Sequence, residues 1–98
     1  MCRVPLFIAV LSLLTGCCSD ERARLWQQKL YSSSSSERGD GAEGLAYCGK
    51  KAESAVPKLA QLLYDENTGV QSMAAFALRR IDTPAARKAL ERASNSRR

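Results

Sequence analysis

The sequence predicts an all-α fold, a short α-solenoid of helix hairpins that follows a cleaved signal segment. An offset of 33 residues aligns residues 28–31 with residues 61–64, and the match runs ungapped through Ala42 on Ala75 and Leu45 on Leu78 to Cys48 on Ile81. A period in the low thirties is typical of helical solenoids. Apolar residues also recur at i, i+3, i+4 and i+7, as an amphipathic helix requires. They are Val56, Leu59, Ala60 and Leu63, then Val70, Met73, Ala74, Ala77, Leu78 and Ile81.

The second repeat unit predicts two helices joined by a short turn. The connection is rich in turn formers, and Thr68 with Gln71 has the spacing of a capping box. Pro57 marks a bend or a late start of the first helix, because a mid-helix proline loses a hydrogen bond. A third helix begins with Thr83 as its cap and Pro84 at its first position. It buries Ala86, Ala89, Leu90 and Ala93.

The first unit departs from this pattern. A helix is expected up to Tyr31, but a run of serines, residues 32–36, replaces the compact turn. Glycines occupy interior positions of the next helix at Gly39, Gly41 and Gly44. Each costs about 0.5–1 kcal/mol relative to alanine, so we expect a frayed helix, ordered only over residues 42–48. The unit is either a degenerate repeat or an amino-terminal helix on a serine-rich linker.

The expected organisation therefore has one small domain with flanking segments. Its parts are a signal segment, 1–16; an anchor, amino-terminal helix and serine-rich linker, 17–41; a repeat region, 42–93; and a disordered basic tail, 94–98.

Four stretches carry a resemblance to a known family. They are Ala55-Val56-Pro57-Lys58-Leu59, the turn at 65–69, Ala74-Ala75-Phe76-Ala77-Leu78 and Ile81-Asp82-Thr83-Pro84. Together they resemble HEAT repeats, most closely the short type found in phycobilisome lyases. The resemblance implies a scaffold whose adjacent helices face a protein partner. The family's usual Val-Arg at the start of the second helix appears as Val70-Gln71, so one of its polar contacts is expected to be absent.

The amino-terminal end carries a second resemblance. Leu14-Thr15-Gly16-Cys17 closes an apolar stretch that begins at Val4, after Arg3. This stretch spans about 17 Å as a helix against a hydrocarbon core of about 30 Å, so it is too short to cross a membrane. The pattern resembles a bacterial lipoprotein signal. That resemblance implies cleavage between Gly16 and Cys17, lipid on Cys17, and a lipid-anchored place in the cell envelope. Cys18 rather than aspartate follows, which favours the outer membrane in an organism with two.

The net charge is positive, and most of the basic residues lie in the carboxyl-terminal part of the chain. Loss of Arg3 with the signal turns 15 basic and 10 acidic side chains into 14 and 10, a net charge of about +4. The basic residues near Arg97 and Arg98 have no aromatic residue among them, so they lack the stacking platform of a nucleic-acid site. Anionic lipid or glycopolymer is favoured over nucleic acid as a partner for this charge. The alternative is a solvated helix face with no partner.

Cys18 and Cys48 are left once Cys17 is assigned to lipid. An oxidising compartment would permit them to pair. Cys48 falls inside an apolar helical pattern, which favours a free, buried thiol instead. The chain has no histidine and no CxxC pair, so no metal site is expected.

Four residues of the second unit are the candidate partner-binding set, because they point away from its apolar stripe: Ser72, Ala75, Phe76 and Arg79. Phe76 leads because the offset aligns it with the polar Glu43, although it could instead pack near Pro84. The sequence thus predicts a lipid-anchored, non-catalytic adaptor that binds a protein, with no nucleic acid, small-molecule substrate or cofactor beyond the lipid. The alternatives are a structural lipoprotein that binds anionic lipid or cell-wall polymer and, third, a lyase-like enzyme accessory.

Overall fold

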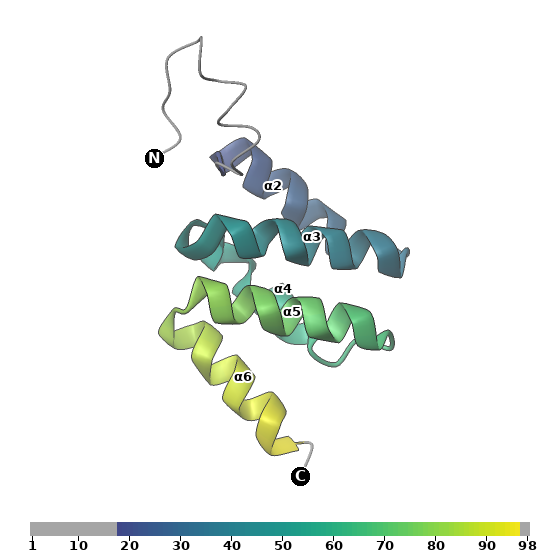
Figure 1. The fold of residues 1–98 in the computed structure, drawn as a ribbon, viewed down its shortest axis with the longest axis vertical. Helices are drawn as coiled ribbons and strands as arrows, with labels where there is room; N and C mark the ends of the chain where they lie inside the picture. Colours follow the sequence, from purple (N-terminus) through teal and green to yellow (C-terminus); the bar gives the residue numbers. More distant parts are fainter. Residues whose placement is uncertain (1–17, 97–98) are drawn as a thin grey trace.

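The computed structural model describes residues 18–96, and this range forms an all-α stack without strands (Figure 1). Its elements are α2 (Asp20–Lys29), α3 (Ser35–Cys48), the 3-10 helix η2 (Gly49–Ala55), α4 (Val56–Leu62), α5 (Thr68–Ile81) and α6 (Pro84–Ser96). The body measures 51 × 29 × 16 Å. In Figure 1, α2, α3, α5 and α6 follow one another down the long axis, and α4 lies behind α5. The predicted all-α fold is confirmed.

The 33-residue repeat of the sequence is a repeat of the structure. Helix α3 spans residues 35–48 and α5 spans residues 68–81, so both ends of α5 fall 33 residues after those of α3. Two residues that are aligned by the offset have the same burial. Leu30 and Leu63 are buried, whereas Tyr31 and Tyr64 are exposed. Helices α2 and α3 therefore form a first repeat, and the linker alternative is wrong. The second repeat consists of η2, α4 and α5, and α6 stands as the first helix of a third.

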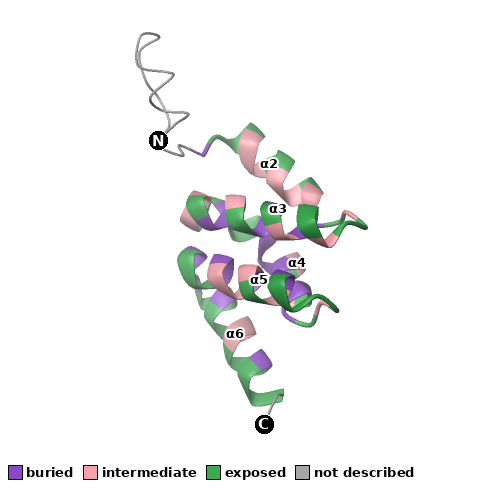
Figure 2. Cartoon of the chain, turned by 45° about the vertical axis from the view of Figure 1, so that its right-hand side comes forward, coloured by how far each residue is buried: buried purple, intermediate pink, exposed green. Residues whose placement is uncertain are grey.

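The hydrophobic core runs through the middle of the stack, where α3 and α5 lie side by side (Figure 2). Buried residues line the facing sides of these helices and of α4, and most outward-facing positions are exposed. Each fully buried Leu or Ile stabilises the fold by about 1.5–3 kcal/mol. The largest fully buried side chains are Leu30, Leu45, Leu59, Val70, Leu78 and Ile81.

Helix α3 is continuous, which corrects the expected fraying before Ala42. A Cβ atom at Gly41 would lie 2.7 Å from the backbone oxygen of Trp26, and one at Gly44 would lie 2.3 Å from the Trp26 ring. These glycines let α2 pack directly on α3, and that packing offsets their low helix propensity. The expected boundary between residues 41 and 42 therefore falls inside a single helix.

Two glycines of α3 are expected to respond to alanine with opposite signs. Gly41→Ala pushes α2 off α3 and should lower the free energy of unfolding by about 1–3 kcal/mol, as overpacking does. Gly39→Ala places a Cβ atom 3.9 Å from Met73 Cγ, an ordinary contact, and should raise it by about 0.5–1 kcal/mol through helix propensity. Urea unfolding followed by circular dichroism measures both. Equal effects of the two changes would contradict the close packing of α2 on α3.

The serine run supplies a turn and a helix cap. The Ser34 hydroxyl accepts a hydrogen bond from the Glu37 amide at 3.4 Å, and the Ser32 hydroxyl donates to the Glu37 carboxylate at 2.8 Å. Such side-chain caps satisfy amides that the first helical turn leaves unpaired. The run is therefore part of the first hairpin.

The second hairpin differs from the prediction at one cap. Asn67, one residue before Thr68, caps α5, and its Oδ1 accepts a hydrogen bond from the Val70 amide at 3.1 Å. The Gln71 side-chain amide donates to the backbone carbonyl of Asp65. Asn67 has the side-chain oxygen that this role requires.

Two proline positions are as predicted. Pro57 lies in the first turn of α4, directly after η2, so it marks the late start of that helix. Pro84 opens α6, and the Thr83 hydroxyl accepts a hydrogen bond from the Ala86 amide at 3.2 Å. Both prolines occupy first-turn positions, where a missing N–H costs no helical hydrogen bond.

Helix α6 extends through Ser96, which corrects the disordered tail expected from residue 94. The Ser96 hydroxyl lies 3.1 Å from the Ala93 carbonyl oxygen and 3.3 Å from the Tyr64 hydroxyl oxygen. These contacts tie the end of α6 to the second repeat. Arg97 and Arg98 lie outside the described residues, as do the signal segment, Gly16 and Cys17.

Candidate interaction surface

Three of the four candidate residues form a ridge along α5. Ser72, Phe76 and Arg79 are spaced i, i+4 and i+7, which places them on one helix face. Ser72 and Arg79 are exposed, and Phe76 is half-buried. We call these three residues the α5 ridge.

Phe76 packs against an aromatic residue of the first repeat. Its ring meets the Tyr47 ring edge to face, with centroids 6.4 Å apart and planes at 77°. Such an aromatic pair contributes about 0.5–1.5 kcal/mol beyond area burial. Tyr47 keeps 60% of its surface exposed, so the pair joins the α5 ridge to α3. Sequence reasoning missed Tyr47, although it lies one turn beyond Glu43, the residue aligned with Phe76.

A groove lies on each side of α5. The groove toward α3 has a volume of about 440 Å³ and includes Asp40, Glu43 and Met73 in its lining. The groove toward α6 has a volume of about 380 Å³ and includes Ala75, Arg79 and Leu90. Ala75 and Arg79 line the second groove together, whereas Phe76 contacts Tyr47 of α3.

The two grooves differ in charge. Carboxylates line the α3 side, whereas Arg79 and Arg80 stand in the last turn of α5. The Tyr47–Phe76 pair therefore has carboxylates on one side and the guanidinium groups of Arg79 and Arg80 on the other. Such a surface is complementary to a partner protein whose surface combines apolar and charged residues.

An ion pair joins the start of α3 to the turn that precedes α5. Arg38 lies in α3 and is almost fully buried, and its Nε and Nη2 donate to the two Asp65 carboxylate oxygens at 2.9 and 3.0 Å. Arg38 Nη1 donates to the Ser32 carbonyl oxygen at 3.0 Å. The pair thus links the turns of both repeats. Arg38 occupies in the first repeat the position that Gln71 occupies 33 residues later in the second.

The same ion pair changes the acidity of Asp65. Its hydrogen bonds with Arg38, aided by the Asn67 amide and the charges of Arg38 and Lys58, hold the pKa of the Asp65 carboxyl below its ordinary value, although burial opposes the shift. The carboxylate is therefore tuned to stay ionised, which suits a structural ion pair.

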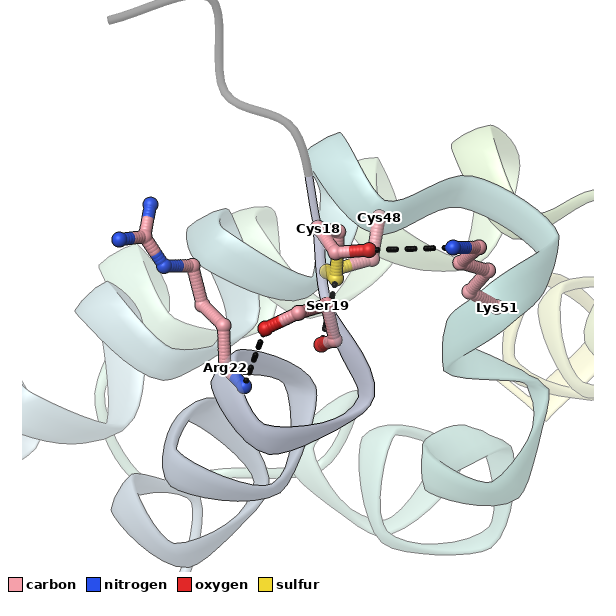
Figure 3. Close-up of a disulfide and its surroundings, with 5 residues drawn as sticks. All are labelled: Cys18, Ser19, Arg22, Cys48 and Lys51. Atoms are coloured by element: carbon pink, nitrogen blue, oxygen red, sulfur yellow. Dashed lines mark hydrogen bonds between the residues drawn. A yellow bond between two sulfur atoms is a disulfide. The ribbon is translucent and has the colours of Figure 1, made fainter. Parts of the chain in front are cut away.

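Cys18 and Cys48 form a disulfide, so the expected free thiol is wrong (Figure 3). Their Cα atoms are 5.1 Å apart although 30 residues separate them. Cys18 directly precedes α2, which brings it close to Cys48. The Ser19 hydroxyl caps α2 by accepting a hydrogen bond from the Arg22 amide at 3.1 Å. Lys51 Nζ donates to the Cys18 carbonyl oxygen at 3.2 Å. The apolar spacing around Cys48 gave no sign of this bond.

Two features are absent from residues 18–96. No helix there is both long and apolar enough to cross a membrane. No group of three or more His, Cys, Asp or Glu side chains there could hold a metal ion.

The stacked hairpins define a helical-repeat protein, in which neighbouring units share a continuous core. The family model described as HEAT repeats matches residues 23–98, most of the chain, so the chain belongs to the HEAT repeat family. Repeats of this family are helical protein-interaction modules and typically non-catalytic scaffolds. No curated protein and no solved structure matched significantly.

Proposed function

We propose that the chain is a lipid-anchored, non-catalytic adaptor that binds a protein partner through the α5 ridge and Tyr47. The observation that carries the proposal is the aromatic pair of Tyr47 and Phe76, which two adjacent repeats present together on an outward face. Aromatic and arginine side chains dominate binding energy at protein interfaces. Arg79, next to Phe76 on the ridge, adds the second of these residue types.

Substitutions on the α5 ridge are expected to weaken capture of the partner. Phe76→Ala removes an aromatic anchor, and Arg79→Glu reverses an exposed charge. Each should lower the amount of a stoichiometric partner captured from native membranes on the order of tenfold, the scale of a hot-spot residue. Because Arg79 is exposed, its variant should unfold with the wild-type midpoint. Gln28→Ala, an exposed change on α2, is the matched control. Undiminished capture by both ridge variants would refute the proposed surface.

The anchor part of the proposal rests on Leu14-Thr15-Gly16-Cys17, with lipid on Cys17 and removal of residues 1–16. The disulfide at Cys18 supports it, because disulfides persist in oxidising compartments outside the cytoplasm. Two or more acyl chains make membrane attachment stable, since each buried methylene contributes about 0.8 kcal/mol. The place of action is then the cell envelope, and the outer membrane where there are two.

Replacing Cys17 is expected to abolish the anchor. Cys17→Ser removes the sulfur that would receive diacylglycerol, so labelling with radioactive fatty acid should fall to background and the precursor should stay uncleaved. Cys2→Ser, a change within the signal segment, is the matched control and should label normally. Persistent labelling of the Cys17→Ser protein would show that the anchor is assigned wrongly.

A further inference from the structure

One edge of the solenoid gathers the connections between successive repeats. The carboxyl-terminal ends of α3 and α5 lie together on the left of Figure 1, where α6 also begins. Lys50 Nζ, just after α3, donates to the Asp82 carbonyl oxygen, just after α5, at 3.1 Å. Arg87 of α6 pairs with the Asp82 carboxylate, also at 3.1 Å. We call this side, residues 48–51 with residues 79–87, the inter-repeat edge.

The disulfide fastens the start of the domain to the inter-repeat edge. Cys18 is bonded to Cys48 at the end of α3, and Lys51 holds the Cys18 carbonyl oxygen (Figure 3). Cys17 is joined to Cys18 by one peptide bond, so their Cα atoms are about 3.8 Å apart. No flexible linker therefore separates the proposed lipid-bearing residue from the folded domain.

The side chains of the inter-repeat edge suit an anionic surface. Five cationic residues here are exposed: Lys50, Lys51, Arg79, Arg80 and Arg87. Arg79 and Arg80 also stand at the carboxyl-terminal end of a helix, where the backbone dipole favours positive charge. Asp82 is already paired with Arg87. The carboxylates near this edge are Asp20 and Glu21, which begin α2, and the exposed Glu53 of η2. The opposite edge carries Glu37, Asp65 and Glu66 in or beside its turns.

We infer that the inter-repeat edge lies against the membrane and that its cations contact anionic lipid headgroups. This inference rests on the proposed anchor at Cys17. The disulfide sets the orientation, because it leaves the edge as the part of the domain nearest the lipid. The turns between the helices of each repeat then point away from the bilayer. The α5 ridge crosses the stack and meets the inter-repeat edge at Arg79, so a partner reaches Ser72 and Phe76 from the side.

The orientation can be tested with the lysines already present in the chain. The lipidated protein is extracted from membranes and reconstituted in vesicles of phosphatidylcholine, with or without phosphatidylglycerol. A membrane-impermeant acylating reagent then modifies lysines, and peptide mass spectrometry reads the rate at each site relative to the protein in neutral detergent. Lys50 and Lys51 report the inter-repeat edge, and Lys29 and Lys58, outside it, are matched internal controls.

Lys50 and Lys51 should be acylated about fivefold more slowly on phosphatidylglycerol vesicles than in neutral detergent. A factor of about five corresponds to the free energy with which an anionic surface attracts one cation. Lys29 and Lys58 should keep their detergent rates. Added salt should remove part of the protection, because it screens exposed charges. Equal protection of all four lysines, or equal rates on both kinds of vesicle, would overturn the inference while leaving the anchor intact. A protein that carries no lipid mass would overturn both.

Discussion

Reduction of the Cys18–Cys48 disulfide is expected to lower the free energy of unfolding by about 3–4 kcal/mol, the largest effect of any single bond in this domain. The bond joins residues 30 apart in sequence, so its loss restores the entropy of a long loop to the unfolded chain. Small helical domains are marginally stable. A loss of this size therefore removes much of the domain's total free energy of unfolding.

The measurement compares oxidised and reduced samples of one preparation by urea unfolding. Fluorescence of Trp26, which packs α2 against Gly44, reports the amino-terminal helix, and circular dichroism reports the whole stack. Because the bond ties α2 to the end of α3, we expect the Trp26 signal of the reduced protein to change first. Cys18→Ser with Cys48→Ser should reproduce the reduced state in the absence of reductant. Identical midpoints before and after reduction would show that the bond does not stabilise the domain.

Asp65→Ala is expected to cost about 3 kcal/mol, because it leaves the Arg38 guanidinium nearly buried without its carboxylate partner. Arg38 and Asp65 side chains are only 11% and 9% exposed. Glu66→Ala is the matched control: that side chain is 92% exposed and lies 4.0 Å from Arg38 Nη2, so its loss should change stability by less than about 0.5 kcal/mol. Urea midpoints of the two variants measure the difference. Similar losses in both would contradict the structural importance of the buried pair.

The same ion pair predicts an acid-sensitive stability. The pKa of the Asp65 carboxyl is lowered in the folded state from an ordinary value of 3.8, so the unfolded chain takes up a proton first as the pH falls. The stabilisation is fully present above the ordinary value and is lost as the pH drops through the lowered one. The urea midpoint of the wild type should fall across this range, and that of Asp65→Ala should fall less. Parallel curves would show that other carboxylates cause the acid sensitivity.

The sequence predicted those features that repeat along the chain. The offset that pairs Leu30 with Leu63 identified the repeat, and the spacing from Val70 to Ile81 identified α5. Both signals are local, because every helix of a solenoid contacts its neighbour in the same register. Thr83 and Pro84 likewise predicted the start of α6, since a helix cap depends on residues next to each other in sequence.

Features that depend on distant residues could not be predicted. The cost of Gly41 and Gly44 is visible in α3 alone, but their benefit comes from Trp26 in another helix. The disulfide partner of Cys48 lies 30 residues away, and only the path of α2 brings it near. The spacing of α5 places Phe76 away from the apolar stripe, but Tyr47 from the preceding repeat covers part of it. In each case the missing information was the spatial neighbour.

An intact-mass spectrum under non-reducing conditions, on protein extracted from its native membranes, tests the lipid-anchored fold most directly. We expect a chain that begins at Cys17, carries the mass of its acyl groups, and takes up a thiol-alkylating reagent at Cys18 and Cys48 only after reduction. A chain that still begins at Met1, carries no lipid, or is alkylated at Cys18 and Cys48 without reduction would contradict a domain clamped next to its own anchor.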